Sequence, residues 1–369
     1  MSDDENHLLY DFLPGLDLSG ALYKEAVKPF MDKHFPDLEY SAVRIGHGSD
    51  VLGYDTAQSM DHDWGPKLQI FLRDSDYGSV KEDLNNKLRE NLPVEVKGFP
   101  TNFEENEDGT LKMSPIKNGP VNHGVEINTV SGFFIGYLGF NPTENLRIID
   151  WLVLPQQMLL SIANGRVFHD GLKKIGPIVT KLEYYPHDLW LYLLANQWRR
   201  ISQEMAFMGR CGQVGDELGS RIVATRLISD IMGLCFLMER QYAPYIKWFG
   251  TAFSKLNSAK TLTPVFTKIL NANTWQERQE YLADAYEHIA KLHNDLGITE
   301  PLTTEVSQFH NRPFMIIHAE KFADAIHSKI EDEEVKQLPK YLGGIDQYVD
   351  STDVLSYTNK FRRFWSMYQ

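Results

Sequence analysis

The sequence predicts an α+β domain followed by an all-helical domain, and three observations lead to this prediction. The chain has 369 residues, which exceeds the usual size of a single hydrophobic core. Its first part mixes helical patterns with strand-like runs, whereas apolar residues recur at helical spacing in the later part. We therefore expect an α+β domain with a small mixed sheet at residues 1–150 and a helical bundle at residues 151–369.

The elements of the first domain follow from periodicity and turn residues. Residues 18–34 have an amphipathic pattern that predicts a helix, and a second helix is expected at 78–91. Apolar or alternating runs predict strands at 40–45, 62–73, 94–99 and 121–130. A segment rich in Asn, Glu and Gly at 101–110 indicates a loop. This order of elements fits an α+β domain with a site at one sheet edge.

Helical periodicity dominates the second domain. A proline at position 186 suits the first turn of a helix whose apolar residues continue to Met208. The segment Gly209–Gly212 is expected to end that helix, and a second helix is expected from Glu217 to Arg240. Further helical runs are expected at 263–271, 274–295, 313–329 and 351–368.

Composition limits the classes of partner and the cellular setting. The chain has 37 basic and 50 acidic residues, and its net charge of -13 argues against a large nucleic-acid footprint. The acidic start, residues 1–12, lacks the basic and apolar regions of a signal peptide, and no apolar run approaches membrane-spanning length. The two cysteines, Cys211 and Cys235, provide neither a zinc spacing nor a disulfide framework, so we expect a cytoplasmic protein.

A Gly-Ser turn and a later pair of acids are the most informative features of the chain. Gly48 and Ser49 are followed by Asp61 and Asp63, which would project from the same face if they lie in a strand. Adjacent carboxylates repel unless a cation lies between them, and Mg²⁺ prefers such oxygen ligands together with substrate phosphates. The turn could offer backbone N–H groups and a hydroxyl to those phosphates. The alternative is a solvated acidic turn between two strands.

This pattern resembles the nucleotidyltransferase superfamily, which includes DNA polymerase β and the antibiotic nucleotidyltransferases. The family pattern is a Gly-Ser turn, an acid-x-acid pair on one strand and a third acid on a later strand, here Glu126. The stretches 46–66 and 209–232 are similar to a bacterial and fungal branch in which an N-terminal nucleotidyltransferase domain precedes a long helical region. The resemblance covers most of the chain, but its chemically specific part is residues 46–66 and 125–127.

The resemblance implies a nucleotidyltransferase fold and a Mg²⁺-dependent transfer of a nucleoside monophosphate, with ATP as the expected donor. Asp61 and Asp63 would be metal ligands and catalytic residues, with Gly48 and Ser49 at the nucleotide phosphates. Glu126 has two functional interpretations, a third metal ligand or the general base for an acceptor hydroxyl, and a third interpretation as a strand carboxylate facing water. The acceptor could be a small hydroxylated molecule, such as an antibiotic-like sugar or amino-sugar, or a protein side chain.

Other polar and aromatic residues have competing interpretations. Among the basic residues of the helical half, Arg221 and Lys247 are candidates for contact with the nucleotide, although a solvated helix face is the simpler interpretation of each. Ser49 could serve turn geometry alone, and Asp50 and Asp55 are expected to be turn or N-cap residues. An aromatic cluster could stack on a substrate ring or form bundle core; it comprises Tyr242, Pro244, Tyr245, Trp248 and Phe249. His169 and Asp170 could line a cleft, although Asn164-Gly165 before them also suits a tight turn.

Two other classes of function fit parts of the sequence. A non-catalytic module could keep the acid pair and bind nucleotide only to regulate a partner. A nucleic-acid end-modifying transferase is disfavoured by the net charge of -13 and by the absence of a basic stretch interleaved with aromatic residues. We expect a nucleoside triphosphate and a hydroxyl acceptor as substrates, and neither nucleic acid nor a membrane as a partner.

Overall fold

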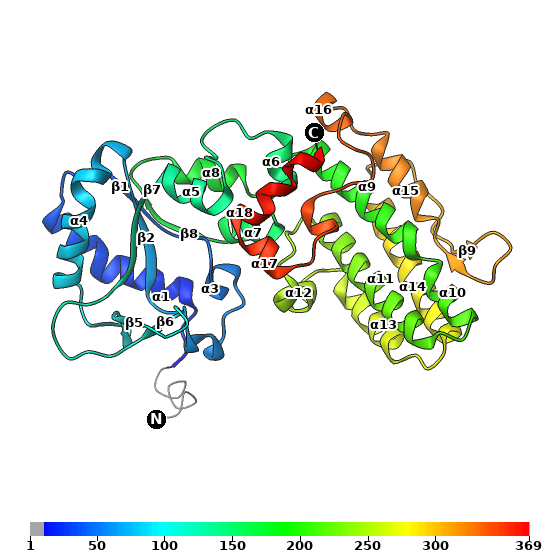
Figure 1. Cartoon of the computed structure of the whole chain (residues 1–369), viewed down its shortest axis with the longest axis horizontal. Coiled ribbons are helices and arrows are strands. Elements are labelled where there is room, and N and C mark those ends of the chain that lie inside the picture. The colour runs from blue at the N-terminus through cyan, green and yellow to red at the C-terminus, as the bar shows by residue number, and fades with distance from the viewer. Residues whose placement is uncertain (1–10, 369) are drawn as a thin grey trace. The chain divides into compact units, whose positions relative to one another are not determined.

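The computed structural model describes residues 11–368, which form two compact units (Figure 1). The first unit contains the residues up to 145 together with 158–183, and the second contains 146–157 and the residues from 184 onward. The sequence analysis assigned 158–183 to the second domain, but this segment supplies a strand to the sheet of the first unit. Residues 1–10, for which no signal peptide was expected, lie outside the described part of the chain.

A four-stranded mixed sheet organises the first unit. Its strands are β1 (Tyr40–Arg44), β2 (Lys67–Leu72), β7 (Gly124–Thr129) and β8 (Arg166–Asp170). They lie in the order β7-β2-β1-β8, with β1 antiparallel to β2 and β8, and β2 parallel to β7. The strands predicted at 40–45 and 121–130 are confirmed. The sequence analysis interpreted the region of β8 as a turn or cleft segment, so this strand was not predicted.

Helices cover one face of the sheet. The chain is helical through α1 (Gly15–Leu22), a π-helical segment (Tyr23–Val27) and α2 (Lys28–His34), and again in α4 (Asp74–Asn91). α1 packs on β2 and α4 packs on β7. The helices predicted at 18–34 and 78–91 are therefore confirmed, and each begins a few residues earlier than expected.

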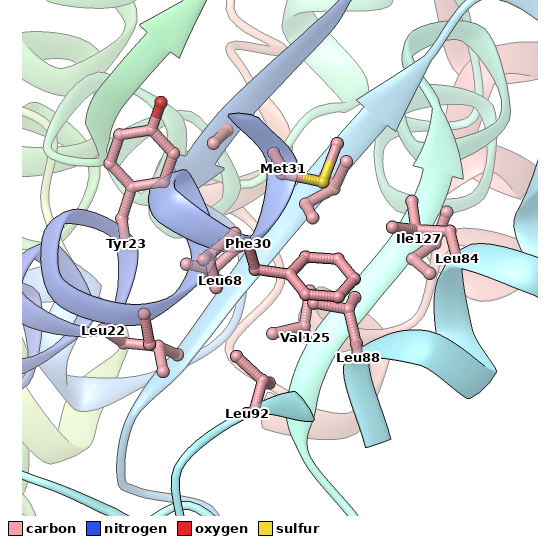
Figure 2. Close-up of a cluster of buried hydrophobic side chains, with 14 of the residues drawn as sticks. Leu22, Tyr23, Phe30, Met31, Leu68, Leu84, Leu88, Leu92, Val125 and Ile127 are labelled. Carbon is pink, nitrogen blue, oxygen red and sulfur yellow. The ribbon is translucent and has the colours of Figure 1, made fainter. Parts of the chain in front are cut away.

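Alternation along the strands explains which side chains form this core. Leu68 and Ile70 of β2 lie on the same face as Val125 and Ile127 of β7, because the parallel register pairs them directly. Figure 2 shows this cluster, in which the labelled residues are Leu22, Tyr23, Phe30, Met31, Leu68, Leu84, Leu88, Leu92, Val125 and Ile127. The opposite face of the same strands carries Lys67, Gln69 and Glu126, and it is the face of interest for function.

Small hairpins and short helices complete the first unit. The hairpin strands are β3 (Glu95–Val96), β4 (Phe99–Pro100), β5 (Phe103–Glu105) and β6 (Leu111–Met113). The short helices are α3 (Ser49–Leu52), the 3₁₀-helix η3 (Ala57–Asp61), α5 (Val130–Leu138) and α8 (Ile175–Lys181), and α7 (Gln156–Ala163) begins in the second unit. The single strand predicted at 94–99 is instead a hairpin, because Lys97 and Gly98 both have positive φ values and reverse the chain. The loop predicted at 101–110 was also wrong in part, since β5 lies within it.

The second unit is mainly helical. Its longer helices are α9 (His187–Glu204), α11 (Glu217–Met238), α13 (Ala259–Asn271) and α14 (Trp275–Asp295). Its shorter helices are α6 (Ile148–Val153), α10 (Phe207–Gln213), α12 (Ile246–Phe253), α15 (Ala319–His327), α16 (Glu333–Lys336), η4 (Ile345–Gln347), α17 (Thr352–Ser356), α18 (Thr358–Phe361) and η5 (Arg362–Tyr368). The helices predicted at Glu217–Arg240, 263–271 and 274–295 are confirmed, and the one at 351–368 is divided into three short pieces.

Two details of the second unit differ from the predictions. A two-stranded ladder, β9 (Ser307–Gln308) with β10 (Met315–Ile316), precedes α15. The glycines at 209–212 do not end a helix but lie inside α10, where a Cβ on Gly209 would meet Phe314 at 2.6 Å and one on Gly212 would meet Trp275 at 2.1 Å. These glycines therefore permit close packing. Among the described residues, no helix is long and apolar enough to cross a membrane.

Candidate functional site

The acid pair lies in a loop before β2. The sequence analysis placed Asp61 and Asp63 at the start of a strand, and this was wrong because β2 begins at Lys67. Asp61 is the last residue of η3, and Asp63 has a φ of 50°, which no strand residue adopts. Their shared direction therefore cannot be derived from strand alternation.

Hydrogen bonds fix the conformation of this acidic loop, defined here as residues 61–63. The backbone N–H of Asp63 donates to the carbonyl of Leu111 at 2.7 Å, and a carboxylate oxygen of Asp63 accepts from the N–H of Leu111 at 2.9 Å. Asp61 accepts from the backbone N–H of His62 at 2.9 Å and lies 3.0 Å from the ring nitrogen Nδ1 of His62. The Asp61 side chain is 48% exposed, so its carboxylate is open to a ligand from solvent.

The Gly-Ser turn follows β1 and is held by a buried ion pair. Arg44 donates two hydrogen bonds to Asp50, from Nε at 2.7 Å and from Nη2 at 2.9 Å, and both side chains are almost fully buried. Gly48 has a φ of 140°, and a Cβ at this position would lie 2.0 Å from a carboxylate oxygen of Asp50. Only glycine fits this position, so the turn depends on the ion pair beneath it.

Residues of the spacer have structural roles. Asp50 was expected to be a turn or N-cap residue, but it is the partner of Arg44. Asp55 accepts from the backbone N–H of Gly15 at 2.7 Å and from the indole of Trp64 at 3.0 Å, so it ties the spacer to α1. The hydroxyl of Ser49, at the first position of α3, makes no hydrogen bond within the described residues and is available to a ligand.

Glu126 lies on the face of the sheet that is opposite the hydrophobic core. The parallel register pairs Glu126 with Gln69 and Gly124 with Lys67, so Lys67, Gln69 and Glu126 share this face. Burial, followed by repulsion from Arg44, lowers the pKa of Lys67, while the carboxylates of Asp63, Asp50 and Glu126 oppose that shift. Lys67 therefore lies within electrostatic reach of both Asp63 and Glu126.

His47, Lys67 and Gln69 are polar residues of this region that the sequence analysis did not identify. Burial and then the Arg44 guanidinium lower the pKa of His47, whereas the Glu126 carboxylate raises it. Gln69 accepts from the backbone N–H of Ile45 and donates to its carbonyl, which fixes the end of β1 next to the turn. A signal was present in the sequence, because Lys67 and Gln69 are the polar positions of an otherwise apolar strand and alternate with Leu68 and Ile70.

The donor types at this site suit Mg²⁺, but three acids do not converge. The carboxylate oxygens of Asp61 and Asp63 are hard ligands, and one or two carboxylates plus phosphates are the usual protein contribution to Mg²⁺ binding. Within residues 11–368, no group of three or more His, Cys, Asp or Glu side chains is close enough to hold one ion. The pair Asp61 and Asp63 therefore fits the metal in chemistry and number, while Glu126 is not placed as a third ligand.

The remaining candidates have individual environments. Arg221 lies on α11 and Lys247 on α12, both in the second unit, and their assignment to nucleotide phosphates stays a prediction. Lys247 lies over the ring of Trp248, with 5.2 Å from Nζ to the ring centroid. Asp170 caps a turn, because it accepts from the Ser41 hydroxyl at 2.7 Å and from the Gly176 N–H at 2.9 Å.

Comparison with known proteins identifies one similarity. Residues 151–249 match a family described as Domain of unknown function (DUF4037). The matched segment runs from α6 to α12 and excludes the acidic loop and the Gly-Ser turn. A comparison with curated proteins gives no match.

Proposed function

We propose that this chain is a Mg²⁺-dependent nucleotidyltransferase, which moves AMP from ATP onto a hydroxyl of a small molecule or a protein and releases pyrophosphate. One observation carries the proposal. The Gly48-Ser49 turn, the acidic loop and Glu126 belong to one compact unit, and Lys67 lies within electrostatic reach of both Asp63 and Glu126. The two free cysteines, Cys211 and Cys235, agree with a proposed cytoplasmic setting.

The residues of the turn and of the acidic loop would bind different parts of the Mg²⁺–nucleotide complex. Asp61 and Asp63 would hold Mg²⁺, which when bound supplies positive charge to the nucleotide phosphates. The hydroxyl of Ser49 would donate to a phosphate oxygen, and the Arg44–Asp50 pair beneath Gly48 would hold the turn in place.

We assign Glu126 to the acceptor rather than to the metal. The absence of a three-carboxylate cluster among the described residues supports this choice. The Glu126 carboxylate would accept the proton of the acceptor hydroxyl as that oxygen bonds to the α-phosphorus. The bond from the α-phosphorus to the bridging oxygen breaks, and pyrophosphate leaves with that electron pair. Lys67, on the same face as Glu126, would orient the phosphoryl group by charge.

A second candidate function uses the same acid pair. A chain with an acid pair and no converging third acid could bind a nucleotide without transferring it, and so act as a regulatory or interaction protein. This candidate predicts Mg²⁺-dependent nucleotide binding with no pyrophosphate release for any acceptor.

Calorimetric titration with a non-hydrolysable ATP analogue tests the shared part of both candidates. Binding by the full chain should require Mg²⁺, and Asp61→Asn/Asp63→Asn should abolish it without changing the circular dichroism spectrum. Glu280→Gln/Asp284→Asn, at two exposed carboxylates of α14, is the matched control for charge. Failure of the wild-type protein to bind any nucleoside triphosphate would end both candidates.

Pyrophosphate release across a set of hydroxyl acceptors separates the two candidates. If Glu126 is the base, Glu126→Gln should lower the turnover number and leave the affinity for Mg²⁺ and the ATP analogue unchanged. An equal loss of affinity would show that Glu126 is a metal ligand instead of the base. Binding without release from any acceptor would favour the regulatory protein.

A further inference from the structure

The second unit contains a cavity of about 170 Å³ that the proposed transfer does not use. Its wall is formed by segments of α6, α9, α11 and α12, together with η4 and α17, all within this unit. An engineered apolar cavity of about 150 Å³ binds benzene, so this volume can hold one six-membered ring with a short substituent.

Aromatic side chains line one part of the cavity. They include Trp151, Tyr185, Tyr245 and Phe249. Tyr245 and Phe249 belong to the aromatic cluster for which the sequence left open a choice between core packing and stacking on a ring. Their position in a cavity wall favours the second interpretation. Aromatic faces attract both ligand rings and organic cations.

The charged groups of the wall are mostly acidic. They are three carboxyl groups, from Asp230, Asp346 and Asp350, and one guanidinium, from Arg200. Asp230 is paired, since Arg200 donates to it at 2.9 Å and Gln197 donates at 3.3 Å. Asp350 is exposed to solvent. These contacts leave Asp346, a half-buried acid, without a charged partner.

Asp346 has no basic partner among the described residues. Its one hydrogen bond from another residue comes from the backbone N–H of Gln156, at 3.0 Å. Burial raises the pKa of Asp346 to about 7, as expected for a carboxyl group without a nearby cation. A carboxylate that is partly removed from water loses hydration, and a cationic ligand would supply the partner that Asp346 lacks.

We propose that this cavity binds a small organic cation, with a primary ammonium group on Asp346 and a ring against Tyr185, Tyr245 and Phe249. The excess of acids over bases in the wall excludes phosphates and carboxylates as its preferred ligands. The ligand is therefore a different class of molecule from the nucleotide. The inference does not depend on nucleotidyl transfer, because binding can be measured without any nucleotide.

Titration with matched amines and alcohols tests the proposal on the full chain. The probes are benzylamine, 2-phenylethylamine and cyclohexylamine, each compared with the alcohol of the same skeleton, at pH 8 and millimolar concentration. We expect at least one amine to bind, and to bind at least tenfold more tightly than its alcohol. No amine binding, or equal binding of amines and alcohols, would overturn the proposal.

Two variants identify the site. Asp346→Asn keeps an oxygen that can accept from Gln156 and should fold, while its affinity for the amines should fall at least tenfold. Asp284→Asn, with the same change of charge on the exposed side of α14, should bind like the wild type. Phe249→Leu should weaken ring-bearing amines and leave methylammonium unaffected. Wild-type amine affinity in Asp346→Asn would show that the amine binds elsewhere, and the assignment would fail.

Discussion

The carboxyl groups of the two units differ in their surroundings. In the first unit, Asp61 and Glu126 are exposed to solvent, and Glu126 lies within electrostatic reach of Lys67. In the second unit, Asp346 is half-buried in a cavity wall that includes aromatic residues, and its one hydrogen bond from another residue comes from a backbone N–H. Exposed carboxylates suit a hard, hydrated ion such as Mg²⁺, which keeps several waters. An enclosed carboxyl group suits an organic cation that can lose its water and contact aromatic rings.

The two sites also differ in how many segments of the chain contribute residues to them. The site of the first unit is concentrated in two short segments, the turn after β1 and the loop before β2, with a few residues from β2 and β7. The cavity of the second unit takes its wall from segments between residues 151 and 355. Variants of the acidic loop should therefore change nucleotide binding and turnover, whereas variants of Asp346 should change amine binding.

The largest expected effect is on turnover. Asp61→Asn/Asp63→Asn should lower nucleotidyl transfer at least about a thousandfold, because the metal contributes several kcal/mol to charge stabilisation. Pyrophosphate release at an ATP concentration that saturates the wild type measures this loss, and the thermal midpoint should stay near that of the wild type because Asp61 is exposed. Wild-type turnover in the double variant would show that the acidic loop is not part of the active site.

The next effect is on the stability of the first unit. Asp50→Ala leaves Arg44 buried without its partner, so the free energy of unfolding should fall by about 3 kcal/mol. Urea unfolding measures this change. Arg44→Leu/Asp50→Leu, which removes both charges, should lose less than the single variant. If the two variants lose the same amount, the buried charge is not the cause.

A smaller effect concerns pH. Asp346 has a higher pKa in the folded protein than in the unfolded chain, so the folded state binds more protons between about pH 4 and pH 7. Its contribution to stability is therefore greatest at low pH and decreases as pH rises through that range. Between pH 5 and pH 7, the stability of the wild type relative to Asp346→Asn should fall by about 2 kcal/mol.

Urea unfolding at the two pH values measures this slope. Other titratable groups are associated with Asp346, namely Tyr185, Tyr348 and Tyr368, and the cavity wall adds Asp230, Asp350 and Arg200. The tyrosines have raised pKa values and do not titrate in this range. Asp284→Asn should keep the wild-type slope. Identical slopes for the wild type and Asp346→Asn would contradict the raised pKa.

The smallest effect separates Asp55, an acid with a structural role, from the proposed metal ligands of the first unit. Asp55→Ala removes the acceptor of the Gly15 and Trp64 hydrogen bonds, so stability should fall by about 1 kcal/mol. Turnover should change less than about threefold, because Asp55 ties the spacer to α1 instead of binding the substrate. A loss of turnover equal to that of Asp61→Asn would show that the acid pair is assigned to the wrong residues.

The sequence determined the element types and the chemical groups available to the chain. Alternation in the runs around Leu68 and Val125 identified β2 and β7, and helical spacing identified α4, α11 and α14, because these signals are local. The order of Gly48-Ser49, Asp61, Asp63 and Glu126 was also read directly from the chain. Such signals depend on neighbours within a few residues, so one sequence is sufficient to predict these elements, whereas the short strand β8 was not predicted from it.

Only the tertiary structure decided where these groups lie and which of them have hydrogen-bonding or ionic partners. The loop conformation of Asp63 depends on Leu111, which is 48 residues away, and Gly48 is required by the Arg44–Asp50 pair. Asp346 became a candidate ligand only because packing placed it in a cavity wall and left it without a cation. Long-range contacts, burial and missing partners arise from packing between distant segments, and no local pattern in the sequence records them.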